Sequence, residues 1–278
     1  MADARRAPLD RSELDRPYAL SAEHIAQYRR DGFIRLGDVL SPGILAHYGA
    51  EISRVVAERS SWYKPLAERD TYGKAFLQVI NIWTQNAMIA ELVRSPRLAR
   101  IAAELMGTRG TRIYHDQALY KEPGGGMTPW HADQRHWPLA SDHSVTAWIP
   151  LQAVPIEMGP LAFAAGSQHL VQRRKELGLE IGDESERVIA RSLTDCRKVE
   201  EPYALGDVSF HGGWTFHRAG PNTTSRQREI MTIIYMDADM ILGEPWNAAQ
   251  TAALESMFQG LKPGDAAATA LNPVVWER

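Results

Sequence analysis

The chain has 278 residues, and its 31 Lys and Arg against 34 Asp and Glu give a formal net charge of −3. A hydrophobic content of 44% with 23% charged residues predicts an ordinary globular core and excludes wholesale disorder. The slightly negative net charge argues against a protein that binds the phosphates of a nucleic acid. The single cysteine, Cys196, excludes internal disulfides and cysteine-based zinc clusters, so any metal site must use His and carboxylate ligands.

The N-terminal segment, residues 1–17, is rich in charges and lacks the apolar stretch of a secretory signal. We expect it to be a flexible tail, followed by one catalytic domain over residues 18–278. No window holds about 18 consecutive apolar residues, so we expect no membrane span. These features, with the lone cysteine, favour a cytoplasmic protein.

The first third of the chain is expected to be mostly helical. Ser21 can cap a helix over residues 22–30, which ends at Asp31-Gly32 before a short strand over residues 33–36. Ser41-Pro42 is typical of a helix start and precedes apolar residues at helical spacing. A third helical pattern covers residues 86–106, and Ser95-Pro96 indicates a break within it.

From Thr111 onward, short runs of β-branched and aromatic residues alternate with Gly and Pro turns, which predicts a β-sandwich or barrel. The expected strands are residues 112–120, 144–153, 161–164, 208–210 and 229–237. The polar stretch over residues 172–201 is expected to be a solvated loop with some helix, and a lid over a site is the alternative. A final helix over residues 243–258 precedes a loop-like tail.

The densest cluster of candidate metal ligands is His131 and Asp133. In an extended strand residues i and i+2 point to the same side, so this pair can present a nitrogen and an oxygen to one point. His217 can supply a third ligand. Two His and one carboxylate on one face of an octahedron leave three positions open, which suits a non-haem Fe(II) oxygenase.

Arg228 lies eleven residues after His217 and just before an apolar strand. A buried guanidinium at this place could make a bidentate pair with a carboxylate of a substrate. An ordinary ion pair at the end of a strand is the alternative. Each of these residues taken alone is a weak signal, and their order and spacing carry the interpretation.

With these residues in place, the sequence resembles the phytanoyl-CoA dioxygenase family of Fe(II)- and 2-oxoglutarate-dependent oxygenases, which includes ectoine hydroxylase. The resemblance covers roughly residues 20–238. The motifs that carry it are Trp130-His131-Ala132-Asp133, Ala147-Trp148-Ile149-Pro150-Leu151, Gly159-Pro160-Leu161, Gly166-Ser167, Gly206-Asp207, and His217 through Asn222 with Arg228. It implies an α+β fold with a mainly β core, a cupin-like jelly roll (double-stranded β-helix) with N-terminal helices packed on it.

The resemblance also implies roles for single residues. His131, Asp133 and His217 match the iron ligands, and Arg228 matches the arginine that holds the distal carboxylate of 2-oxoglutarate. Trp148 matches a tryptophan that lines the cosubstrate pocket.

Three further residues are candidate cosubstrate contacts by the same resemblance. Gln117 lies where family members place another 2-oxoglutarate contact, and Gln78 lies where some members have a lysine. Lys121 is a third candidate. The implied reaction uses Fe(II), 2-oxoglutarate and O2, and it releases succinate and CO2.

The sequence departs from the family pattern in its loops and at one pocket position. Ala219 replaces a serine that is common two residues after the distal histidine. The usual Asn-Gly-Pro-Leu and Pro-Gly-Ser-His turns read Met158-Gly159-Pro160-Leu161 and Ala165-Gly166-Ser167-Gln168. Related halogenases lack the carboxylate ligand, so Asp133 favours hydroxylation or a related oxidation.

The expected substrate is a small-molecule metabolite, and the number of aromatic residues makes an apolar or ring-containing one plausible. His115, His136 and His211 are potential decoys for the metal ligands. We expect a monomer or a homodimer that binds neither nucleic acid nor membrane. Two other functions stay open: a cupin-like metal enzyme that does not use 2-oxoglutarate, and a catalytically silent binding protein that kept the fold.

Overall fold

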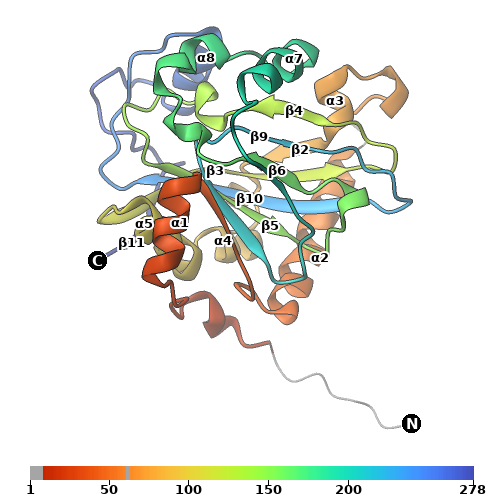
Figure 1. The fold of residues 1–278 in the computed structure, drawn as a ribbon. Coiled ribbons are helices and arrows are strands. Elements are labelled where there is room, and N and C mark those ends of the chain that lie inside the picture. Colours follow the sequence, from red (N-terminus) through yellow and green to blue (C-terminus); the bar gives the residue numbers. More distant parts are fainter. Residues whose placement is uncertain (1–8, 61–62) are drawn as a thin grey trace.

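The computed structural model describes residues 9–60 and 63–278, and two antiparallel sheets form its centre (Figure 1). The large sheet has seven strands in the order β1-β8-β5-β10-β3-β11, with β2 also paired to β3. Its strands are β1 (Phe33–Leu36), β2 (Leu77–Ile80), β3 (Gly110–Lys121), β5 (Ser144–Pro150), β8 (Val208–Gly212), β10 (Arg228–Asp237) and β11 (Val274–Glu277). The small sheet has the order β4-β9-β6-β7, from β4 (Thr128–His131), β9 (His217–Ala219), β6 (Leu161–Ala164) and β7 (Lys198–Glu200).

The alternation of side chains along a strand gives the large sheet two different faces. On β10, Met231, Ile233 and Tyr235 join the largest buried cluster, which the sheet shares with the helices. Arg228 and Thr232 point the other way, into a cavity between the two sheets. One face of the large sheet therefore packs against the helices, and the opposite face lines the cavity.

Helices cover the outer face of the large sheet (Figure 1). They are α1 (Ala22–Asp31), α2 (Pro42–Ser60), α4 (Ala87–Val93) and α5 (Pro96–Met106). The predicted break at Ser95-Pro96 is present, because the Ser95 side chain caps α5 and Pro96 occupies its first turn. The short helix α3 (Thr71–Ala75) lies near β4, beside the small sheet.

Gly32 ends α1 and allows the chain to turn sharply into β1. Its φ of +83° lies in the left-handed region, and a Cβ there would meet the side-chain oxygens of Gln168 and Thr215. The close approach also lets the Gly32 carbonyl accept a 2.7 Å hydrogen bond from Thr215 Oγ1, next to β9. Gly32 thus ties the helical layer to the strand that carries His217.

The segment over residues 172–201, predicted as a solvated loop with some helix, contains two helices and the strand β7. Its helices are α6 (Arg174–Leu177) and α7 (Asp183–Ser192), and α7 packs against β4. Ile189 and Leu193 are buried with Trp130 and Phe216 in a cluster on the outer side of the small sheet. These apolar side chains make α7 an amphipathic helix. The high average polarity of the segment predicts a loop, because it does not register so few apolar residues.

The C-terminal region differs from the sequence prediction in two places. The final helix, α8 (Ala248–Met257), begins later than residue 243, because the Asn247 side chain caps it by accepting a hydrogen bond from Gln250 N. The tail after Lys262 was expected to be loop-like, but β11 pairs with β3 and extends the large sheet. This strand follows Pro273 and is only four residues long, so its sequence pattern is weak.

Part of the segment predicted as a flexible tail, residues 1–17, packs on the domain. Arg11–Leu14 form a single 3-10 turn, Leu14 is buried, and its carbonyl accepts a 3.0 Å hydrogen bond from Ser95 Oγ. Residues 1–8 lie outside the described residues, so the tail itself stays a prediction.

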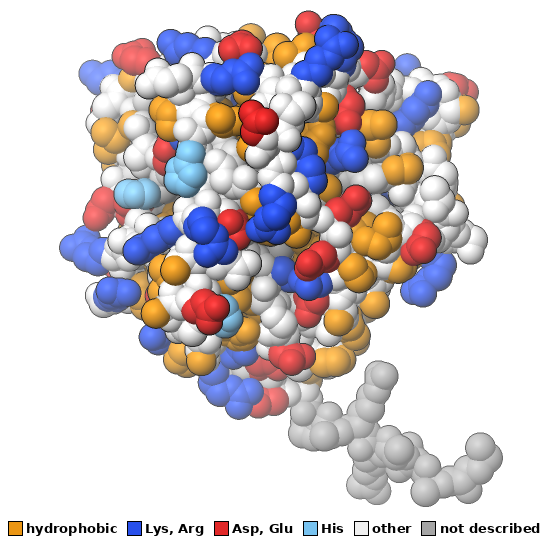
Figure 2. All heavy atoms as spheres, in the orientation of Figure 1, with side chains coloured by type: hydrophobic (Ala, Val, Ile, Leu, Met, Phe, Trp, Pro, Cys, Tyr) orange, Lys and Arg blue, Asp and Glu red, His pale blue; other side chains and the backbone are white. Residues whose placement is uncertain are grey.

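The surface and the helices bear on possible partners. On the face seen in Figure 2, basic, acidic and apolar side chains are interspersed. Among the described residues, no helix has the length and the apolar composition needed to cross a membrane. The absence of nucleic-acid binding stays a prediction.

Candidate metal centre and cosubstrate pocket

His131 and Asp133 flank the end of β4. His131 is the last residue of that strand, Ala132 is still extended with φ −123° and ψ 128°, and Asp133 begins a 3-10 turn. Because the residue between them is extended, both side chains point to the same side, as the sequence spacing predicts. Both line the cavity between the sheets.

His217 comes to the same point from β9. It lies directly opposite His131 in the antiparallel pairing of β4 and β9, and the two ring centroids are 4.2 Å apart. Residues separated by 86 positions in the chain therefore become neighbours through one strand pair. The structure brings the three predicted ligands together.

The three candidate ligand atoms lie close together, and each has a lone pair available for a metal ion. Asp133 Oδ1 lies 3.6 Å from His131 Nε2 and 3.7 Å from His217 Nε2, and all three atoms lie within 4.8 Å of one another. His131 Nδ1 donates to Pro129 O at 2.7 Å, and His217 Nδ1 donates to Thr215 O at 3.0 Å. With the proton on Nδ1, each ring turns its Nε2 lone pair toward the carboxylate.

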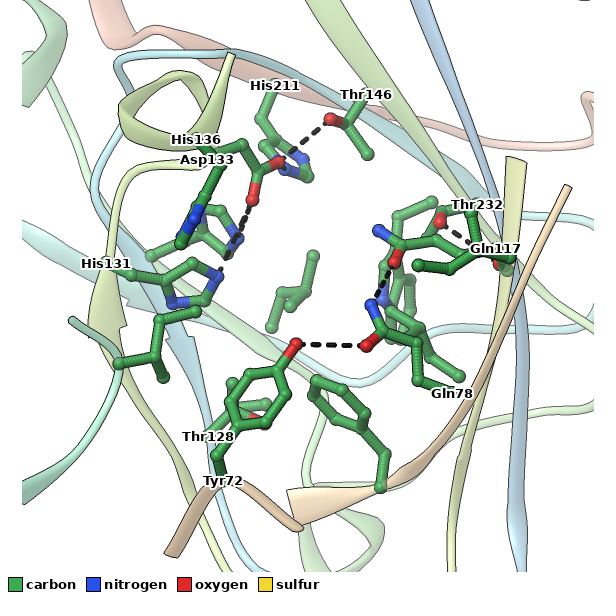
Figure 3. A pocket seen from close by; sticks show the side chains of 18 of the residues that line it. Tyr72, Gln78, Gln117, Thr128, His131, Asp133, His136, Thr146, His211 and Thr232 are labelled. Carbon is green, nitrogen blue, oxygen red and sulfur yellow. Dashed lines mark hydrogen bonds and ion pairs between the residues drawn. The ribbon is translucent and has the colours of Figure 1, made fainter. Parts of the chain in front are cut away.

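The second oxygen of Asp133 is held from outside the triad. Asp133 Oδ2 accepts a 2.9 Å hydrogen bond from Thr146 Oγ1 on β5 and a 3.2 Å hydrogen bond from His211 Nε2 on β8 (Figure 3). These two donors fix the carboxylate plane and leave Oδ1 for a metal ion. His211 was a decoy in the sequence interpretation, and its place beside Asp133 depends on the pairing of β8 with β5, which residue spacing does not reveal.

The protonation states suit metal binding. Burial alone would raise the pKa of Asp133, but His217, His131 and His211 around it hold that pKa well below its usual range. Burial, with the neighbouring His131 and His211, lowers the pKa of His217 well below its usual range. An anionic carboxylate and neutral imidazoles are the forms that coordinate a metal ion.

A cavity of about 300 Å3 extends from the triad between the two sheets. Inward-facing positions of β3, β5, β8 and β10 line its floor, since alternate residues of each strand face this side. The lining residues are Tyr72, Phe76, Gln78, Ile80, His115, Gln117, Leu119, Thr128, His131, Asp133, His136, Trp137, Thr146, Trp148, Leu161, Ile181, His211, His217, Ala219, Arg228 and Thr232. Seven of the eight candidate site residues belong to this set, and Lys121 does not.

Arg228 provides a buried positive charge in the cavity. It is 1% exposed, its Nη1 donates to Gly159 O, and its Nε has no hydrogen-bond partner among the described residues. Burial lowers the pKa of Arg228 to about 9, and no carboxylate contributes to that environment. A buried guanidinium without an acid partner is costly, and an anion from outside the chain could offset that cost.

Two neighbours define the surroundings of Arg228. The Trp148 ring lies 5.6 Å from the Arg228 guanidinium carbon, and Trp148 is 2% exposed. Lys121 lies directly opposite Arg228 in the pairing of β3 with β10. Lys121 is fully buried, donates to Gly126 O, and does not line the cavity. Its pKa is lowered to about 6, first by burial and then by Arg228.

A hydrogen-bonded chain of polar side chains lies across the cavity from the triad (Figure 3). Tyr72 Oη donates to Gln78 Oε1 at 3.1 Å, and Gln78 Nε2 donates to Gln117 Oε1. Gln117, Thr232 and Trp148 form one row across β3, β10 and β5. These uncharged donors and acceptors line the same cavity as the triad and Arg228.

The residues present fit a metal ion and a dicarboxylate. Two imidazole nitrogens and one carboxylate oxygen converge without a competing donor between them, which is the ligand set of non-haem iron oxygenases. The unpartnered Arg228 lies in the same cavity and offers planar donors to a carboxylate.

Comparisons with known proteins agree with the site. The chain is 28% identical over 171 residues to ectoine dioxygenase of Bordetella bronchiseptica, which covers 59% of this chain and 54% of that protein. It thus spans about half the length of that relative. The non-haem α-ketoglutarate (2-oxoglutarate)-dependent carbocyclase SnoK from nogalamycin biosynthesis superposes with a TM-score of 0.75 at 28% identity, covering 92% of this chain and 97% of SnoK.

A second solved structure contains ligands. The epimerase SnoN, in complex with Fe3+, α-ketoglutarate and nogalamycin RO, superposes with a TM-score of 0.72 at 27% identity. The match covers 91% of this chain and 98% of SnoN. The predicted cupin-like jelly-roll fold with N-terminal helices is confirmed, although the two sheets do not close into a barrel over the described ranges. The sequence matches the phytanoyl-CoA dioxygenase (PhyH) family over residues 28–230, and this chain therefore belongs to that family.

Proposed function

We propose that the protein is an Fe(II)- and 2-oxoglutarate-dependent oxygenase that hydroxylates, or otherwise oxidises, a small-molecule metabolite. One observation carries the proposal: a convergent His-Asp-His triad shares a cavity with a buried arginine that has no acid partner among the described residues. Family membership supports the same conclusion.

His131, Asp133 and His217 would hold the iron, which leaves three positions for the cosubstrate and O2. Bound Fe(II) and 2-oxoglutarate supply the oxidising power from O2, with succinate and CO2 as coproducts. The chain's own contribution is to fix the ligands. Thr146 and His211 orient Asp133, and backbone carbonyls fix the tautomers of His131 and His217.

Arg228 would anchor the distal carboxylate of 2-oxoglutarate through paired hydrogen bonds. Trp148 would pack beside that anchor, and Gln117 and Gln78 would supply uncharged hydrogen-bond partners. Ala219 lines the cavity where a serine is common, so one hydroxyl contact is absent. The sheets bury these groups and keep bulk water from the oxidant.

Asp133 favours hydroxylation over halogenation, because the carboxylate takes the position that a halide would need. The neighbours named carbocyclase and epimerase catalyse other outcomes on the same fold. The product therefore distinguishes the outcomes: hydroxylation adds one oxygen atom, cyclisation or desaturation removes two hydrogens, and epimerisation leaves the formula unchanged.

The direct test measures succinate with Fe(II), 2-oxoglutarate and O2 against a panel of ring-containing metabolites. We expect one substrate class to raise succinate above the uncoupled background and to yield a changed product by mass spectrometry. Asp133→Ala is the control and should show neither. If wild-type protein loaded with Fe(II) makes no more succinate than Asp133→Ala with every compound, the proposal is wrong. A cupin-like enzyme without 2-oxoglutarate or a silent binding protein would then explain the site.

A further inference from the structure

The part of the cavity that neither the triad nor Arg228 uses consists of aromatic, apolar and uncharged polar groups. Tyr72, Phe76 and Trp137 contribute rings, and Ile80 and Ile181 contribute aliphatic side chains. Ile80 lines the cavity but is 47% exposed, so it lies at the mouth of the cavity. At about 300 Å3 the cavity is at the small end of ligand sites, so it holds the cosubstrate and the reacting portion of a substrate.

No formal charge is available to a substrate in this part of the cavity. Among the described lining residues, only Asp133 and Arg228 carry one. Asp133 belongs to the triad, and Arg228 is assigned to the cosubstrate. An anionic or cationic group of a substrate would therefore be buried without a counter-ion, which is strongly unfavourable.

His136 presents a hydrogen-bond donor that nothing in the described chain uses. Arg135 Nη1 lies 3.3 Å from His136 Nδ1, and a guanidinium can only donate, so His136 Nδ1 accepts and the ring proton is on Nε2. This Nε2 atom is buried and has no hydrogen-bond partner in the described residues. His136 lines the cavity on the same side as His131 and Asp133 (Figure 3).

The orientation of His136 is enforced by its neighbours. Arg135 is itself fixed, because its Nε donates to Gly178 O at 2.8 Å and its Nη2 pairs with Glu180. Burial first, and then the charge of Arg135, lowers the pKa of His136 to about 4. The ring is thus neutral at physiological pH and retains one unpartnered donor, on a side chain that lines the cavity.

A second histidine offers the complementary group. His115 Nδ1 lies 3.2 Å from Asp116 O, and a carbonyl only accepts, so Nδ1 carries the proton and Nε2 has a lone pair. Burial lowers the pKa of His115 to about 4, and the residue also lines the cavity. The substrate side therefore has one fixed uncharged donor and one fixed uncharged acceptor between aromatic rings.

From this geometry we infer that His136 is a substrate-orienting residue, whose Nε2–H donates to a carbonyl or hydroxyl oxygen of an uncharged, ring-containing substrate. The inference rests on the proposed function and specifies the substrate class of that site. The inferred substrate class differs from the anions in the names of two relatives, a probable hypophosphite dioxygenase and a methylphosphonate hydroxylase. An anionic substrate would lack a counter-ion in this cavity.

The test uses three ring compounds of similar shape as probes: 2-tetralone, which has a carbonyl; tetralin, which has no acceptor; and 2-naphthoate, which is an anion. Each is titrated anaerobically into protein loaded with Fe(II) and 2-oxoglutarate, and the visible charge-transfer band reports its arrival beside the iron. We expect 2-tetralone to bind about tenfold more tightly than tetralin, and 2-naphthoate to bind more weakly than both.

His136→Phe should reduce the preference for 2-tetralone over tetralin to about one, whereas His136→Gln, which keeps a donor, should retain part of it. His143→Phe, at an exposed histidine outside the cavity, should leave it unchanged. Tight binding of 2-naphthoate, a preference that survives in His136→Phe, or no binding of any probe would overturn the inference. The band before any probe is added tests the proposed function separately, and its absence in folded wild-type protein would overturn both.

Discussion

The role of Arg228 can be isolated by replacing it with methionine, which keeps much of the side-chain volume and removes the charge. Arg228 is buried and its Nε has no partner in the described chain, so the carboxylate of 2-oxoglutarate would complete its hydrogen bonding. Charge-assisted hydrogen bonds contribute about 1.5–3 kcal/mol each. The loss of a bidentate pair should therefore weaken 2-oxoglutarate binding by about 3–6 kcal/mol, or roughly two to four powers of ten.

The same substitution should not harm the cosubstrate-free protein. Burial lowers the pKa of Arg228 to about 9, so the charged form is disfavoured by its surroundings. The substitution removes the hydrogen bond to Gly159 O, at a cost of about 1 kcal/mol, and the guanidinium contact with the Trp148 ring, which a methionine side chain can partly replace. We expect the melting temperature of the cosubstrate-free Arg228→Met protein to equal or exceed that of the wild type.

The assay is an anaerobic titration of the Fe(II)-loaded protein with 2-oxoglutarate, followed at its charge-transfer band. Arg226→Met, two residues away and exposed, is the matched control and should bind 2-oxoglutarate like the wild type. Arg228→Lys should recover only part of the affinity, because an ammonium cannot form the planar pair. An affinity of Arg228→Met within threefold of the wild type would refute the assignment of Arg228.

Three further substitutions test other parts of the structure. His211→Phe removes one hydrogen-bond donor from Asp133 and should weaken iron binding by about 10–100-fold, measured by competition with a chelator. An unchanged affinity for iron would show that the hydrogen bond from Thr146 alone orients Asp133. Burial lowers the folded-state pKa of Lys121 to about 6, so the unfolded chain binds more protons above that pH and stability rises toward alkaline pH. Lys121→Met should flatten this rise, at most about 1.4 kcal/mol per pH unit in urea unfolding, and a persisting slope would assign it to another group. Gly32→Ala forces a φ of +83° on a residue with a Cβ and should cost about 1–3 kcal/mol in the same assay, whereas a neutral effect would mean that the turn relaxes.

The long strands could be predicted from sequence, as could the short strands β1 and β6, whereas the other short strands could not. The runs in β3, β5 and β10 are rich in β-branched and aromatic residues, and their predicted bounds agree with the structure within a few residues. Strands β2, β4, β7, β9 and β11 have three or four residues each and were not predicted. Their pairing is decided by tertiary contacts, and β4 even contains Pro129.

The candidate site shows the same division. The spacing of His131 and Asp133 predicts their common direction, because one extended residue separates them. The contribution of His211 depends on which strand lies beside β5, and the free donor of His136 depends on a hydrogen bond from Arg135. Such roles follow from strand order and ring tautomer, which no residue pattern contains.

The proposed iron and cosubstrate site is tested most directly by a crystal structure of the protein soaked with Mn(II) and 2-oxoglutarate without O2. We predict one anomalous peak bound by His131 Nε2, Asp133 Oδ1 and His217 Nε2, with the distal carboxylate of 2-oxoglutarate paired to Arg228. A metal bound elsewhere, or a 2-oxoglutarate carboxylate that does not contact Arg228, would contradict the account.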